Sequence, residues 1–115
     1  EEVLSKKVST LSKGFAQRTS LAKALVFHPK LLIMDEFSGG LDPAQIISVR
    51  NVIKSISKSC ITVLSTHHIE EAVSLCDYMY IIHNGHVAMK GTSEEILSGT
   101  GKNNMEEAFL CLTKE

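Results

Sequence analysis

Residues 31–36, Leu-Leu-Ile-Met-Asp-Glu, decide the fold. Four consecutive apolar side chains end abruptly in two carboxylates, and a run this short and apolar predicts a strand over 31–34 that is covered on both faces. A second run rich in β-branched residues, Ile-Thr-Val-Leu, follows at 61–64. Between them, Asp42-Pro43 predicts the start of a helix, with Asp as the N-cap and Pro in the first turn. Strand, helix and strand within about 35 residues form a βαβ unit, so we expect the two strands to be parallel.

Further helices and a hairpin flank this unit. Residues 14–27 are rich in good helix formers and stop before Pro29, which disfavours helix in the residue before it. Asn84-Gly85 separates two apolar segments, 78–83 and 86–90, and therefore predicts a β-hairpin. Three short helices are expected after His67, after the capping box at 92–95, and over 105–112. The class is α/β, with a parallel βαβ core, a carboxyl-terminal antiparallel β-hairpin and terminal helices.

Composition narrows the possible functions. The 115 residues are 43% apolar with a net charge of −1, which fits one globular domain and lacks the basic excess of a nucleic-acid binder. We therefore expect no nucleic-acid partner. No apolar stretch approaches the ~20 residues of a membrane span, and the first residues do not resemble a signal peptide, so any membrane connection should run through a partner. Three scattered cysteines indicate free thiols in a reducing compartment.

The two carboxylates after the first strand are candidate catalytic residues, because ligands of parallel sheets gather at the carboxyl ends of the strands. Asp35 would hold Mg²⁺ through water, and Glu36 would orient or deprotonate an attacking water, as phosphoryl transfer requires. The alternative is that the chain simply turns polar on reaching solvent. His67 follows the second strand and should arrive at the same edge. A metal site built on His67-His68 would need further ligands, and none is evident nearby.

A second candidate site lies upstream, at residues 11–18, where a polar loop runs into the first helix. The hydroxyl of Ser12 and the amide of Gly14 at a helix amino terminus would form an anion site, helped by the helix dipole. The alternative is an ordinary N-cap serine.

Taken together, these segments resemble the ATPase domain of ATP-binding-cassette (ABC) proteins. The similar motifs are the signature at 11–18, Walker B with its catalytic glutamate at 31–36, the D-loop at 39–43 and the switch-histidine loop at 65–67. The sequence from Asp77 to Ile96 is similar to the family's typical end. Residues 104–110 look most like the ATPase subunits of multidrug-type and gliding-type exporters.

The resemblance implies a partial P-loop NTPase fold. Residues 1–28 would be the end of the helical subdomain, and residues 29–115 the ATPase core and carboxyl-terminal end of one domain. Two such domains would sandwich two ATP molecules head to tail. Asp35 would hold Mg²⁺, Glu36 would act as general base, and His67 would bond the γ-phosphate.

The remaining implied site residues serve the nucleotide at the dimer interface. Ser12 and Gly14 would contact the γ-phosphate of the ATP bound to the other protomer. The resemblance also implies that Gln17 and Asp42 belong to this nucleotide site. Asp42 would support communication between the two nucleotide sites of the dimer. The signature and D-loop are variants at four positions: Lys13, Phe15, Phe37 and Gly39.

The implied activity is Mg²⁺-dependent ATP hydrolysis coupled to a transmembrane permease, on the cytoplasmic side of the cell membrane. No GxxxxGK[ST] phosphate-binding loop (Walker A) occurs in the 115 residues, and no matching glutamine loop does either. We therefore expect the chain by itself to be inactive. Two alternatives remain: a truncated, non-enzymatic dimerisation or regulatory module, and an ABC-type ATPase of DNA repair, chromosome structure or translation.

Overall fold

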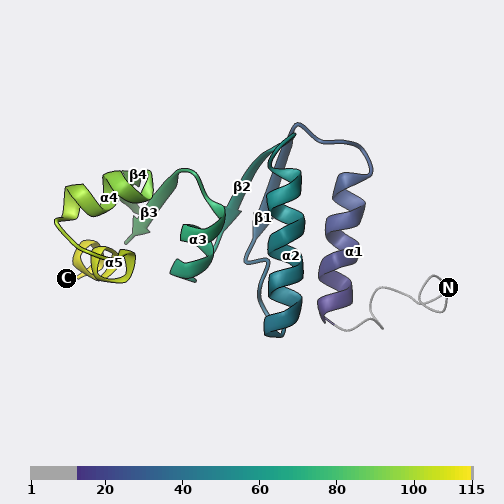
Figure 1. Ribbon diagram of the computed structural model, residues 1–115, viewed down its shortest axis with the longest axis horizontal. Helices are drawn as coiled ribbons and strands as arrows, with labels where there is room; N and C mark the ends of the chain where they lie inside the picture. Colours follow the sequence, from purple (N-terminus) through teal and green to yellow (C-terminus); the bar gives the residue numbers. More distant parts are fainter. Residues whose placement is uncertain (1–12, 115) are drawn as a thin grey trace. The chain divides into compact units, whose positions relative to one another are not determined.

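The computed structural model describes residues 13–114, and the chain divides into two compact units. Unit 1 ends at Ser65, and unit 2 begins at Thr66. The described elements of unit 1 are α1 (Lys13–Leu25), β1 (Leu31–Asp35), α2 (Pro43–Ile56) and β2 (Ile61–Ser65). Those of unit 2 are α3 (Ile69–Leu75), β3 (Met79–His83), β4 (His86–Gly91), α4 (Ser93–Thr100) and α5 (Met105–Thr113) (Figure 1).

Unit 1 is built on the predicted parallel strand pair. β1 and β2 are hydrogen-bonded neighbours, in a register that pairs Leu31 with Ile61 and Asp35 with Ser65. The crossover between them contains α2, as a parallel connection requires. The predicted βαβ unit is thus confirmed, and both strands end at one edge of the sheet.

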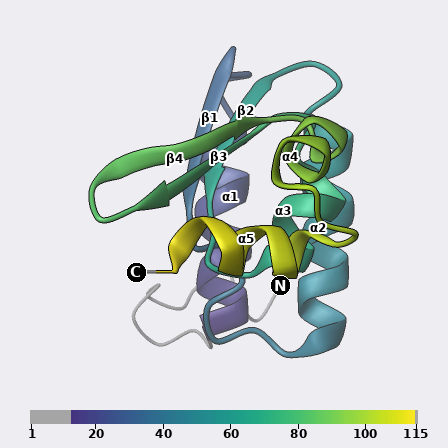
Figure 2. The same cartoon turned by 90° about the vertical axis from the view of Figure 1, so that its left-hand side faces the viewer.

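Only one face of this strand pair is covered by the helices of unit 1. Helices α1 and α2 lie side by side on one side of β1 and β2 (Figure 1; Figure 2). Within β1, Leu32 is 6% exposed whereas the next residue, Ile33, is 71% exposed. On β2, Ile61 and Val63 are also exposed. The prediction that the first strand is covered on both faces is therefore wrong for the described residues, because successive strand side chains point to opposite faces and both helices pack on the same one.

Unit 2 is built on the predicted hairpin. β3 and β4 pair antiparallel, with His83 opposite His86 across the turn. Both turn residues, Asn84 and Gly85, have positive φ angles of 48° and 77°. This is the turn geometry that favours Asn-Gly, because its twist matches that of the flanking strands. A shift in register after Ile81 marks a β-bulge.

The core of unit 2 lies between this hairpin and the terminal helices. Helices α4 and α5 contact the hairpin and each other, and α3 contacts α5. The buried cluster consists of Met79, Ile81, Ile96 and Ala108. Within β3, Tyr80 and Ile82 are exposed and alternate with the buried Met79 and Ile81. The ring of Tyr80 meets that of Tyr78, the exposed residue just before β3, edge to face with centroids 5.6 Å apart. One face of β3 therefore forms the core, and its other face carries exposed large side chains.

Candidate functional site

The first candidate catalytic residue, Asp35, ends β1 and lies beside Ser65, the last residue of β2. The Ser65 hydroxyl donates a hydrogen bond to Oδ1 of Asp35. The carboxylate is solvent-exposed and stands at the carboxyl edge of the parallel pair. A carboxylate oriented in this way is an oxygen ligand of the kind that hard cations prefer.

Glu36 follows in an unusual backbone conformation. Its φ angle is +44°, in the left-handed region that non-glycine residues rarely adopt. Its amide donates to the carbonyl of Ser65 at 3.0 Å, and its carbonyl accepts from the amide of Gly39 at 3.2 Å. The chain therefore leaves the sheet directly after Glu36, which places this exposed residue on a tight loop at the strand end. Such strained positions cluster at functional sites.

The loop that follows Glu36 is anchored by two buried residues. Phe37 is 2% exposed, and Ser38 is buried as well. The Leu41 amide donates to the Ser38 carbonyl at 3.1 Å, which closes a turn. An aromatic side chain packed in the interior immediately after Glu36 limits how far the loop can move. From the sequence, Phe37 was noticeable only as a departure from the family pattern.

Asp42 caps helix α2. Its Oδ1 accepts from the amide of Gln45 at 2.8 Å, and the Gln45 side chain accepts from the amide of Asp42 at 3.2 Å. This reciprocal pair is a capping box, and it confirms the N-cap predicted at Asp-Pro. The side chain of Asp42 therefore has a structural role in addition to the role at the dimer interface that the resemblance implies.

Gly14 lies in the first turn of α1 and packs against this cap. A Cβ added at Gly14 would stand 2.7 Å from the side-chain amide of Gln45, closer than real Cβ contacts allow. An alanine at residue 14 would therefore have to displace the end of the Gln45 side chain. Two sequence motifs 31 residues apart, from Gly14 to Gln45, thus meet within unit 1. No local sequence signal predicts the contact.

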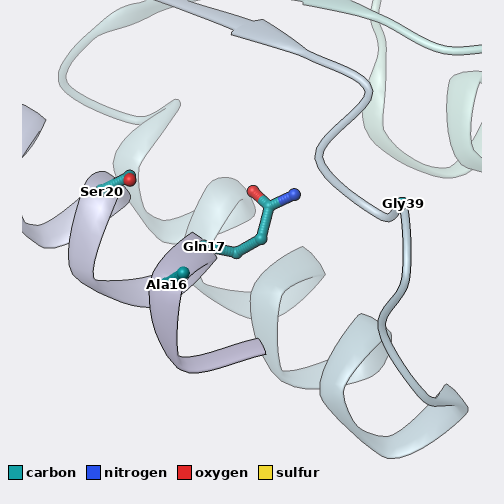
Figure 3. A pocket seen from close by; sticks show the side chains of 4 residues that line it. All are labelled: Ala16, Gln17, Ser20 and Gly39. Carbon is teal, nitrogen blue, oxygen red and sulfur yellow. The ribbon is translucent and has the colours of Figure 1, made fainter. Parts of the chain in front are cut away.

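Gln17 lies one helical turn further along α1. With Ala16, Ser20 and Gly39, it lines a shallow groove between α1 and the loop after β1. Its side chain extends from the helix into this groove (Figure 3). Ser12, the other signature residue singled out from the sequence, lies outside the described residues.

His67 belongs to unit 2 and is exposed, just before His68, the N-cap of α3. Its ring lies 4.0 Å from that of His68, centroid to centroid, with the planes tilted by 39°. The sequence predicts that His67 lies close to Asp35 and Glu36. Because His67 belongs to one unit and the two carboxylates to the other, this stays a prediction. Among residues 13–114, no group of three or more His, Cys, Asp or Glu side chains could hold a metal ion. Within the same range, no helix has the length and apolar character of a membrane span.

Comparison with known proteins assigns the class. A family model described as "ABC transporter" matches residues 1–39 of the chain. A solved structure of an ATP-binding subunit of an ABC transporter superposes with a TM-score of 0.86 at 34% identity, covering 96% of this chain and 48% of that one. An ATP-binding cassette of an ABC transporter, 23% identical, shares the fold with a TM-score of 0.68 over 90% of this chain and 42% of its own.

Two curated relatives carry functional names. The lipopolysaccharide export system ATP-binding protein LptB of Escherichia coli (strain K12) is 36% identical over 89 residues, which are 76% of this chain and 37% of that protein. The methionine import ATP-binding protein MetN 2 of Acinetobacter baylyi is 39% identical over 90 residues, 76% of this chain and 26% of the relative.

The parallel pair, the appended hairpin and the structural likenesses make the fold a partial P-loop NTPase domain. Within that class, the chain belongs to the ABC transporter family, as a fragment of its nucleotide-binding domain. The chain spans about a third of LptB and about half of the solved ATP-binding subunit.

Proposed function

We propose that this chain supplies the hydrolytic residues of an ABC transporter ATPase subunit. The observation that carries the proposal is the pair Asp35 and Glu36 at the carboxyl end of β1, held beside Ser65 by the parallel register. In parallel sheets this edge is where ligands bind. Asp35 and Glu36 are both exposed, so each is accessible to a bound ligand.

The chemistry divides between three side chains. Asp35 would hold Mg²⁺, which supplies charge neutralisation on the phosphates when bound. Glu36 would take the proton of the attacking water, and His67 would hydrogen-bond the terminal phosphate. Mg²⁺ is bound typically by one or two carboxylates together with water and substrate phosphates, so a single exposed carboxylate fits it, and a cage of several protein ligands is not needed.

The rest of the nucleotide site is proposed to be shared between two domains. Ser12 and Gly14 would serve the nucleotide of the partner domain, and Gln17 would lie in the same interface. The burial of Gly14 against the capping box of Asp42 supports this arrangement, because it links signature and D-loop mechanically within one unit. A change at one nucleotide could thereby reach the other.

We further propose that the ATPase drives a transmembrane permease from the cytoplasmic face of the membrane. The names of LptB and MetN 2, an export and an import protein, support a role in transport in general. The resemblance of residues 104–110 to exporter subunits favours export. Because the 115 residues contain no GxxxxGK[ST], we propose that hydrolysis requires the complete domain with its phosphate-binding loop, and that the chain alone does not hydrolyse ATP.

The deciding experiment replaces the proposed base in the complete domain. Glu36→Gln keeps the shape of the side chain and removes its basicity, so kcat should fall by about 100-fold or more while ATP affinity changes little. Glu94→Gln is the matched control, because Glu94 is an exposed carboxylate on α4 to which the proposal assigns no role. Mg²⁺-dependent ATPase rates and nucleotide binding would be measured for both. A Glu36→Gln enzyme with the wild-type rate would show that Glu36 is not the base.

A further inference from the structure

Unit 2 contains a buried carboxylate that the proposed chemistry does not use. Glu71, in the first turn of α3, is 2% exposed, whereas its neighbour Glu70 is exposed. Burying a carboxylate is costly unless hydrogen bonds replace the lost water. The contacts of Glu71 therefore indicate what the burial achieves.

Glu71 is connected to the residues on both sides of His67. The Thr66 hydroxyl donates to Oε2 of Glu71 at 2.6 Å, and the same hydroxyl oxygen accepts from the amide of His68 at 3.0 Å. The amide of Glu71 donates in turn to the carbonyl of His68 at 3.1 Å. A hydroxyl has one proton to donate, so its donation to Glu71 leaves its lone pairs facing the His68 amide.

We propose that Glu71 is a positioning residue for His67. This inference rests on the proposed function, in which His67 contacts the terminal phosphate. Through Thr66 on one side and His68 on the other, Glu71 holds the backbone of the switch-histidine loop at two points. His67 itself is exposed and its ring lies beside that of His68, so holding the backbone on both sides of it limits the directions that its side chain can take. Misplacing a catalytic group by about 1 Å can cost about 100-fold in rate, so a fixed loop has kinetic value.

The kinetic test uses the complete domain and the hydroxyl of Thr66. Thr66→Val keeps the shape and removes both hydrogen bonds, and should lower kcat by about 10- to 100-fold. Thr66→Ser keeps the hydroxyl and should restore most of the rate. Ser74→Ala is the matched control, because the Ser74 hydroxyl donates to the main-chain carbonyl of Glu71 and not to its carboxylate. Glu71→Gln, whose amide oxygen can still accept, should give an intermediate rate.

A double substitution separates positioning from a general structural role. If Thr66 acts only through His67, Thr66→Val should lower the rate no further in a His67→Ala background. Multiplying losses would overturn the inference, as would a Thr66→Val enzyme within about twofold of the wild-type kcat. A His67→Ala enzyme with unchanged kcat would instead refute the role of His67 in the proposed function.

A second measurement uses the 115-residue chain and needs no activity. Hydrogen exchange of the His68 amide should become about tenfold faster in Thr66→Ala, because one hydrogen bond is lost. Amides of the β3–β4 hairpin should keep their rates, since only the loop is released. Unchanged exchange at His68 would show that the Thr66 hydroxyl does not hold this loop, and would overturn the inference. Equal acceleration throughout unit 2 would also overturn it, because it would show that the substitution destabilises the whole unit.

Discussion

Two adjacent residues of β1 provide a sharp test of which face of the strand pair is buried. Leu32 is 6% exposed and Ile33 is 71% exposed, although both are large aliphatic side chains in the same strand. Their substitution by alanine removes apolar groups of similar size at positions one residue apart. The sequence alone predicts equal losses, because it predicts a strand covered on both faces. The structure predicts very unequal ones.

The magnitudes follow from these exposures. Leu32→Ala should cost about 2–4 kcal/mol of unfolding free energy, as for other buried leucines whose removal leaves a cavity. Full burial of an isoleucine is worth roughly 1.5–3 kcal/mol, and less than a third of the Ile33 surface is buried. Ile33→Ala should therefore cost only about 0.5–1 kcal/mol. The expected difference between the two variants is larger than the error of a careful measurement.

Urea unfolding of the 115-residue chain, followed by circular dichroism, would measure both losses. The unfolding should be repeated at a tenfold higher concentration, because exposed apolar strands favour association. Equal losses for the two variants at low concentration would contradict the one-sided burial of β1. Equal losses that appear only at high concentration would show that a second copy covers the open face.

Three further predictions concern single contacts. Asp42→Ala should destabilise the chain by about 1 kcal/mol in the same unfolding assay, while Asp42→Ser, which retains the cap, should cost much less. Gly14→Ala should displace the Gln45 side chain and lose stability in the wild type but not in a Gln45→Ala background, and a loss that persists there would place the clash elsewhere. Cys111 is exposed, whereas Cys76 is half-buried and burial raises the pKa of its thiol. Iodoacetamide at pH 8 should therefore modify Cys111 first, and mass spectrometry would follow the order of modification. The reverse order would contradict the packing of unit 2.

The elements that sequence reasoning predicted correctly depend on local signals. Asn84-Gly85 forms the predicted hairpin turn because these two residues accept positive φ angles at little cost. The Asp42-Pro43 pair starts α2 because a carboxylate and a proline suit the first turn of a helix. The parallel pairing of β1 and β2 followed from a chirality and connection rule, which applies whatever the side chains are.

The positions that sequence reasoning missed depend on residues distant in the chain. The burial of Phe37 and the fit of Gly14 against Gln45 arise only when loop and helices pack together. The bond between Thr66 and Glu71 spans five residues across a loop, a spacing that no periodic pattern describes. No local sequence pattern marks these residues, so their contacts could be recognised only in the folded structure.

The position of the candidate residues follows from residue order alone, because carboxylates that follow an apolar strand must emerge at its carboxyl end. That order predicts Asp35 and Glu36 at the edge of the sheet, where the structure has them. Packing alone decided that both helices of unit 1 cover the same face of the sheet, leaving Ile33 exposed and Leu32 buried. It also decided that a glutamate of α3 turns inward to hold the loop of His67. Burial is a property of the assembled interior, and a strand or helix pattern specifies only which side chains share a face.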